Sequence, residues 1–281
     1  MEKKNQSGSG DAPTFVDVRS YYVRGRNALA VQAEFSSLYV DYYLHLMDQG
    51  LPGESVSDSL LKDALATITL HATTRPWKET HAWTLHFSEP ALNVFVTAGS
   101  LLESVTGRVF TKGIRESGKS LFYAQVHLSG QTPRQSVVEI PERDVLSAVE
   151  TYYRRSEQRT ARLFNLVDDE VLMVSAQPGC DLGWLDSLNQ GMALDLHEGE
   201  ETALLETRRY RFHCGCSPAR IYPAIAPIAA SQGLDGLFMG EQVITIQCPR
   251  CAARWRISRE QMEALMAERA PTSQSQSQPN A

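Results

Sequence analysis

The chain has 281 residues, of which 42% are hydrophobic and 21% charged, and its formal net charge is −6. This length and apolar content suffice for one sizeable core and a smaller module. No run of about 18 apolar residues occurs, which excludes a membrane-spanning helix, and the polar start lacks the apolar segment of a secretory signal peptide. We therefore expect a soluble, cytoplasmic protein.

The folded part begins with a predicted hairpin and two helices. Aromatic and β-branched residues flank Gly25 and Asn27 in the run Tyr21–Phe35, which indicates two strands joined by a turn. Apolar residues then recur at helical spacing in Ser36–Gly50 and in Ser55–Leu70. Each of these helices presents one apolar stripe, so both are expected to pack on a core.

A series of strand-like runs follows, rich in β-branched and aromatic residues. These runs are His81–Phe87, Leu92–Gly99, Ser104–Phe110, Leu121–Leu128 and Gln135–Ile140. Next come a helix over 142–153, a hairpin that turns at Asp168 and Asp169, and a shorter helical zone over 181–206. Because strict βαβ alternation is absent, the pattern predicts an α+β fold with a mixed or antiparallel sheet.

Four of the five cysteines form two close pairs near the C-terminus. Cys214 and Cys216 are separated by one glycine, Cys248 and Cys251 by two residues, and 31 residues lie between the pairs. In a reducing compartment such pairs are more often metal ligands or redox groups than permanent disulfides. Zinc binds four thiolates in a closed tetrahedron, so the spacing predicts one Zn²⁺ per chain held by these four residues in the reduced state.

Other candidate ligands have weaker support. His213 precedes the first pair, but four cysteines already complete a tetrahedral shell. Cys180 stands alone and is interpreted as an ordinary thiol. His45 and His71 lie within helical patterns and are expected to be structural or to face solvent.

No catalytic motif accompanies the cysteines. The sequence has no phosphate-binding G-x-x-x-x-G-K-[ST] loop, no G-x-G-x-x-G after a strand and no H-E-x-x-H. A G-x-S-x-G nucleophile elbow is absent too. The sequence therefore predicts a protein that is not an enzyme.

Two motifs carry a family resemblance. In YYRRSEQRTARLFN (Tyr152–Asn165) an aromatic residue, S-E-Q and an R-L-F strand follow one another: Tyr153, Ser156, Glu157, Gln158, Arg162, Leu163 and Phe164. FHCGCS and CPRCAARWRI supply F-x-C-x-C-S and a C-x-x-C before an aromatic strand, with Trp255 where tyrosine is usual. The chain resembles the redox-regulated heat shock protein 33 chaperones, and the order of elements agrees from about Phe15 to Met266.

The resemblance implies a fold and a mechanism. It implies an N-terminal α+β domain, a helical linker and a C-terminal zinc domain in a holdase chaperone that is inactive while reduced and zinc-bound. Oxidants would join Cys214 to Cys216 and Cys248 to Cys251, release zinc and unfold the linker. Exposed apolar surface would then bind unfolding client proteins. The expected partners are these clients and, on oxidation, a second copy of the chain, but no nucleic acid and no membrane.

The predicted organisation has five parts. They are a disordered tail (1–14), an N-terminal α+β domain (15–177), a helical linker (178–207), a four-cysteine zinc-binding redox-switch domain (208–269) and a second disordered tail (270–281).

Two other functions are compatible with the cysteine pairs. A zinc ribbon that binds nucleic acid or protein would use Arg250, Arg254, Arg256 and Arg259, which cluster beside the C-x-x-C and could contact phosphate. A thiol–disulfide oxidoreductase needs an exposed C-x-x-C at a helix start in a βαβ context. Cys248 instead follows a strand-like run and precedes another, which disfavours the oxidoreductase.

Overall fold

The computed structural model describes residues 14–51, 55–115, 117–140 and 143–269. The chain divides into two compact units, residues 1–214 and residues 215–281. The predicted tails, 1–14 and 270–281, lie outside the described residues except for Thr14. No helix in the described ranges is long and apolar enough to cross a membrane.

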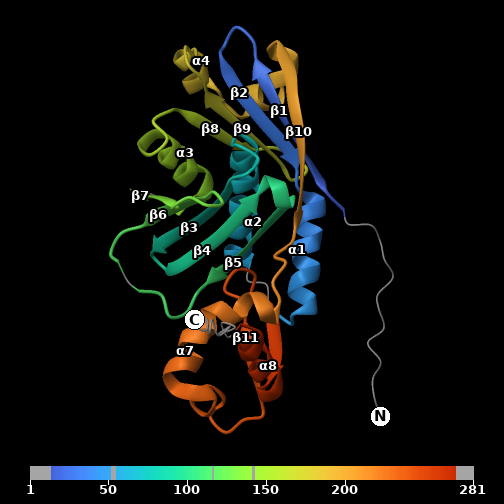
Figure 1. Ribbon diagram of the computed structural model, residues 1–281. Helices are drawn as coiled ribbons and strands as arrows, with labels where there is room; N and C mark the ends of the chain where they lie inside the picture. Colours follow the sequence, from blue (N-terminus) through green and yellow to red (C-terminus); the bar gives the residue numbers. More distant parts are fainter. Residues whose placement is uncertain (1–13, 52–54, 116, 141–142, 270–281) are drawn as a thin grey trace, which may run out of the picture. The chain divides into compact units, whose positions relative to one another are not determined.

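A mixed sheet, with ten strands in the described part of the chain, organises the first unit (Figure 1). Its order is β7-β6-β3-β4-β5-β10-β1-β2-β9-β8. Neighbours are antiparallel except β5 and β10, which run parallel where Arg211 pairs with Ser104. The strands are β1 (Val16–Val23), β2 (Ala28–Glu34), β3 (Thr80–Ser88), β4 (Ala91–Gly99), β5 (Ser104–Phe110), β6 (Leu121–His127), β7 (Arg134–Glu139), β8 (Ala161–Asn165), β9 (Glu170–Ala176) and β10 (Thr202–Phe212).

The sheet and its helices confirm the predicted α+β class. The hairpin β8–β9 shows why the local prediction succeeds. Asp168 and Asp169 both have positive φ, 55° and 56°, and the Glu170 amide donates to the Val167 carbonyl (3.0 Å). Two left-handed central residues match the right-handed twist of the flanking strands, and aspartate tolerates that conformation.

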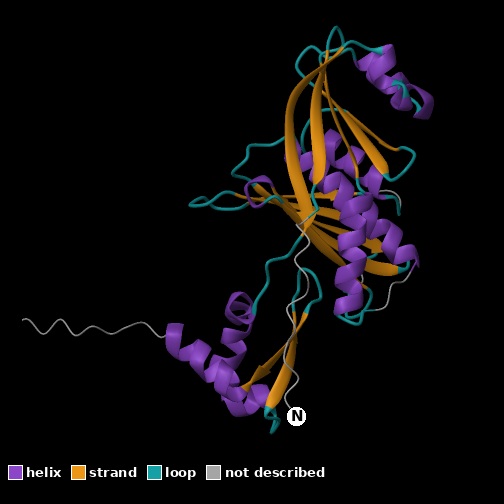
Figure 2. Cartoon of the chain, turned by 90° about the vertical axis from the view of Figure 1, so that its right-hand side faces the viewer, coloured by secondary structure: helices purple, strands orange, loops and turns teal. Residues whose placement is uncertain are grey.

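Three helices lie against the strands of the sheet (Figure 2). They are α1 (Ser36–Asp48), α2 (Ser55–Thr73) and α3 (Val145–Arg155), and a short 3₁₀ turn η1 (Ser100–Leu102) follows β4. α2 carries the buried Leu61 and Leu65 into the main apolar cluster. A Cβ at Gly107 of β5 would lie 2.5 Å from the Phe95 carbonyl oxygen and 3.0 Å from Leu61 Cδ1, so glycine permits this close packing.

Two buried histidines meet beside this core. His71 of α2 and His81 of β3 are each 1% exposed, and their ring centroids are 4.7 Å apart. His71 Nδ1 lies 2.8 Å from the Tyr153 hydroxyl, so the structural interpretation of His71 holds. Burial lowers the pKa of both imidazoles, that of His81 to about 4.

These lowered pKa values predict an acid-sensitive first unit. An unfolded histidine takes up a proton near pH 6.5, whereas folded His81 resists protonation until about pH 4. Stability is therefore fully present above pH 6.5 and falls as pH drops toward 4. Relative to pH 8, His81 alone should lower the free energy of unfolding by about 1 kcal/mol at pH 5.5. Urea unfolding at both pH values should show this loss, and His81→Gln should lessen it. An equal loss in the variant would contradict the assignment.

The segment predicted as a helical linker is only partly helical. Residues 178–207 contain three short helices, α4 (Leu182–Ser187), α5 (Gln190–Leu194) and α6 (Leu196–Gly199), but the following residues form β10. β10 continues past the predicted boundary at 207/208 and ends at Phe212. It alternates buried Arg208, Tyr210 and Phe212 with outward residues. The sequence interpretation missed this strand because a buried arginine disguises the period-two pattern.

The buried arginine fastens β10 to the end of α2. Arg208 is 5% exposed, and its Nη1 donates to the carbonyls of Ala72 (3.1 Å) and Arg75 (2.8 Å) and to Ser100 Oγ (3.0 Å). Its Nη2 donates to Glu206 Oε1 (2.7 Å). Charge-assisted hydrogen bonds of this kind are strong, so β10 is a firmly held strand of the first unit.

The second unit is small and has a correspondingly small core. It contains α7 (Pro218–Phe238), β11 (Val243–Gln247), β12 (Arg254–Ser258) and α8 (Arg259–Arg269). Its apolar cluster centres on the buried side chains of Tyr222, Phe238, Ile257 and Met262. A core of this size supplies little folding energy, and domains of this kind usually need a metal or disulfides.

Candidate metal centre

The four predicted cysteines come together. The sulfurs of Cys214, Cys216, Cys248 and Cys251 all lie within 4.8 Å of one another. The sulfurs of Cys216 and Cys251 are 3.6 Å apart. A tetrahedron with metal–sulfur bonds of about 2.3 Å has edges of about 3.8 Å. The cluster therefore has the size and donor set to hold one metal ion.

The first pair is positioned by the end of β10 and the start of α7. The His213 amide donates to the Val105 carbonyl (2.9 Å), and this hydrogen bond extends the pairing of β10 with β5 as far as the residue before Cys214. Gly215 then turns with φ +61°, a conformation that glycine adopts at little cost. Ser217 caps α7 by accepting a hydrogen bond from the Arg220 amide (3.3 Å), and Arg220 Nη1 donates to the Gly215 carbonyl (2.9 Å).

The second pair lies in the turn between β11 and β12. The Cys248 amide donates to the Ala253 carbonyl (2.8 Å), and the Ala252 amide donates to the Cys248 carbonyl (3.0 Å). Ala252 has φ +64°, which wraps the backbone around the sulfurs. Cys248 and Cys251 are both buried, each 2% exposed. The turn thus holds two buried sulfurs close together. Their burial limits the access of water molecules that would compete with them as metal ligands.

The weaker candidates lie outside this cluster. Among the described residues the group of metal-ligating side chains contains the four cysteines and neither His213 nor Cys180. Cys180 packs instead on the second apolar cluster of the first unit, with Trp184 and Leu185. Burial raises the pKa of the Cys180 thiol, which disfavours the thiolate form. His45 lies against the ring of Phe212.

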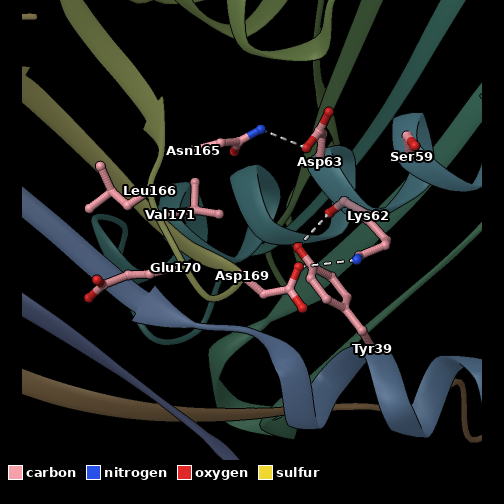
Figure 3. Close-up of a pocket in the computed structure, with 9 residues that line it drawn as sticks. All are labelled: Tyr39, Ser59, Lys62, Asp63, Asn165, Leu166, Asp169, Glu170 and Val171. Carbon is pink, nitrogen blue, oxygen red and sulfur yellow. Dashed lines mark hydrogen bonds and ion pairs between the residues drawn. The ribbon is translucent and has the colours of Figure 1, made fainter. Parts of the chain in front are cut away.

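A polar pocket in the first unit provides no second metal centre among the described residues (Figure 3). Lys62 Nζ pairs with Asp169 (3.1 Å) and lies 4.2 Å from the ring centre of Tyr39. Asn165 Nδ2 donates to Asp63 Oδ1 (3.1 Å). The acidic groups that face this pocket already have partners, so it does not present a set of open ligands.

Comparisons with known proteins agree with the predicted family. No protein-family model matches the chain. The chain is 23% identical over 164 residues to the 33 kDa chaperonin of Nitrosococcus oceani, an alignment that covers 51% of this chain and 56% of that protein. The match therefore spans about half the length of this curated relative.

The fold is similar to a solved structure from the same group. The crystal structure of a 33 kDa chaperonin (heat shock protein 33 homolog) from Thermotoga maritima superposes with a TM-score of 0.69 at 14% sequence identity. The superposition covers 90% of this chain and 98% of that one. Sequence and fold together agree with the resemblance carried by the two motifs: the chain is similar in sequence to one 33 kDa chaperonin and similar in fold to another, a heat shock protein 33 homolog.

Proposed function

We propose that this protein is a redox-switched chaperone of the holdase type, with one Zn²⁺ bound by Cys214, Cys216, Cys248 and Cys251 in the reduced state. The observation that carries the proposal is the cluster of four sulfurs within 4.8 Å on a unit with a small apolar core. Four thiolates suit zinc, a soft to borderline cation that prefers tetrahedral sites. Zinc bound there would supply folding energy to residues 215–269.

Oxidation is the proposed trigger. Hydrogen peroxide or a similar two-electron oxidant would convert two thiolates into one disulfide, while the peroxide is reduced to two waters with uptake of two protons. Two equivalents would oxidise both pairs. We propose disulfides Cys214–Cys216 and Cys248–Cys251, because the partners within each pair have the highest effective concentration once zinc leaves. A disulfide across one intervening residue is strained and therefore easily reduced, which suits a reversible switch.

Exposed apolar side chains support the client-binding step. On α1, Val40, Leu44 and Met47 are 56%, 51% and 75% exposed and follow one another at helical spacing. An exposed apolar stripe of this kind is typical of a protein-interaction surface. We propose that unfolded clients bind this stripe together with the apolar side chains of residues 215–269 that oxidation exposes, in a reducing cytosol where the switch is normally off.

The proposal is tested by client aggregation. Peroxide-treated protein should suppress the thermal aggregation of a model client, whereas the reduced, zinc-loaded protein should not, because zinc keeps the second unit folded. Reduction with dithiothreitol and zinc should reverse the effect. Arg250, Arg254 and Arg256 are exposed beside the second cysteine pair, so the same samples should also be titrated with an oligonucleotide. Salt-dependent oligonucleotide binding without client protection would favour a zinc-ribbon module instead.

A further inference from the structure

A second pocket of the first unit lies outside the metal centre and has no part in the proposed switch. It has a volume of about 320 Å³ and is partly open to solvent. The side chains on which the argument depends are His71, Arg75, Glu79, His81, Arg134 and Glu157. The S-E-Q motif, 156–158, borders this pocket as well. The S-E-Q motif, which carries part of the sequence resemblance, thus borders a site to which the proposed zinc switch assigns no function.

The carboxylates of the pocket already have partners. Glu79 Oε1 accepts from Arg134 Nη2 (3.0 Å), and its Oε2 lies 3.4 Å from His81 Nε2. Glu157 Oε1 accepts from a tyrosine hydroxyl of α3 (2.6 Å), and its Oε2 forms an ion pair with Arg75. Three of the four oxygens thus have a hydrogen-bonded or ion-paired partner, and Glu79 Oε2 faces an imidazole nitrogen, so the pocket has little acceptor capacity left for a cation.

Hydrogen-bonding capacity remains on the nitrogens. Arg75 Nε, His71 Nε2 and both ring nitrogens of His81 are buried and have no hydrogen-bond partner among the described residues. Both histidines are 1% exposed, so solvent does not compensate them. A buried polar group without a partner is costly, and a ligand that supplies acceptor oxygens would remove that cost.

The charges around the histidines are predominantly positive. Apart from burial, which is the largest cause, Arg75 lowers the pKa of both histidines. Arg159 adds to this effect at His71 and Arg134 at His81, while Glu157 opposes it at His81. The hydroxyls of the two tyrosines of α3 complete the surroundings but carry no charge, because burial raises their pKa. The net field therefore attracts an anion and repels a cation.

We propose that this pocket binds a small tetrahedral oxyanion, either a free ion such as sulfate or phosphate or the phosphate group of a larger solute. The anion accepts hydrogen bonds from Arg75 Nε and from the imidazole N–H groups and pairs with Arg134 at the rim. Charge-assisted contacts of this kind are the strongest that arginine makes. Because a bound anion favours the protonated imidazoles, binding tightens as pH falls toward the pKa of His81, about 4.

Sulfate is the probe, because it remains a dianion from pH 5.5 to pH 8. Isothermal titration of the reduced, zinc-loaded full chain should show binding that is tighter at pH 5.5 than at pH 8. Arg134→Gln should weaken it about tenfold, since a charge-assisted contact is lost. The Arg134 side chain is 74% exposed, so this variant should fold. Arg24→Gln is the matched control: Arg24 is 59% exposed, pairs with Glu201 and does not line the pocket.

Further measurements test the pH dependence and distinguish a free oxyanion from the phosphate group of a larger solute. His81→Gln should remove most of the pH dependence. Glycerol phosphate should compete with sulfate if the pocket accepts the phosphate group of a larger solute, and should fail to compete if it accepts the free ion alone. Absence of sulfate binding to the wild type, or equal weakening by Arg134→Gln and Arg24→Gln, would overturn the proposal. None of these results depends on client protection, so the holdase proposal stands or falls separately.

Discussion

Cys251→Ser is expected to lower the zinc content of the reduced protein from about one ion per chain to a small fraction of that value. Structural zinc in small domains contributes roughly 10–16 kcal/mol of apparent binding energy. If four thiolates share it evenly, the loss of one costs about 3 kcal/mol, which weakens affinity more than a hundredfold. Cys251 is buried, and its sulfur lies 3.6 Å from the Cys216 sulfur. Water therefore cannot take the place of the missing thiolate as a ligand unless the turn opens.

The second unit should lose its structure in this variant, because its apolar cluster is small. Metal analysis by mass spectrometry and hydrogen exchange over residues 215–269 measure the two effects together. Cys180→Ser is the matched control, since Cys180 packs on a different apolar cluster. Undiminished zinc in Cys251→Ser, or an equal loss in Cys180→Ser, would show that the four sulfurs are not the ligands.

Peroxide is expected to open the second unit and to leave β10 closed. Once zinc is released, little holds residues 215–269 together. β10 instead pairs with β1 from Val16 to Val23, and Arg208 ties it to the end of α2. Hydrogen exchange after peroxide treatment should therefore rise by orders of magnitude in 215–269 and remain unchanged in 203–211.

Arg208→Met tests what limits this opening. The substitution removes the guanidinium that donates hydrogen bonds to the Ala72 and Arg75 carbonyls. Each buried carbonyl left without a donor lowers the free energy of unfolding by about 1–3 kcal/mol. Exchange in β10 should then rise in the oxidised protein. Arg209→Met is the control on the same strand, because Arg209 is half exposed and pairs with Glu103 at the surface. Opening of 203–211 in the oxidised wild type would show that the switch extends into the sheet, contrary to this account.

The local parts of the structure were predictable from the sequence. The turn at Asp168 and Asp169 and the stripes of α1 and α2 depend on neighbouring residues, and so does the spacing within each cysteine pair. β10 was not predictable, because its buried Arg208 finds partners more than a hundred residues earlier in the chain. Ser217 followed by Pro218 was a readable signal for the start of α7, and the sequence interpretation passed over it.

The oxyanion pocket shows the same limit. Its nitrogens come from α2, β3, the loop between them and β7, and its carboxylates from that loop and from the segment after α3. Nothing in the local sequence marks His81 as a neighbour of His71, since their proximity is created by the packing of α2 on the sheet. The S-E-Q motif was visible, but its role depends on the ion pair between Glu157 and Arg75, which only the fold brings together.

The central claim is that loss of zinc from the four cysteines activates client binding. One peroxide titration tests it most directly, with zinc release and suppression of client aggregation measured on the same samples. The account predicts that both rise together, that zinc approaches one ion released per chain, and that dithiothreitol with zinc reverses both. Complete zinc release with no gain in client protection would contradict it.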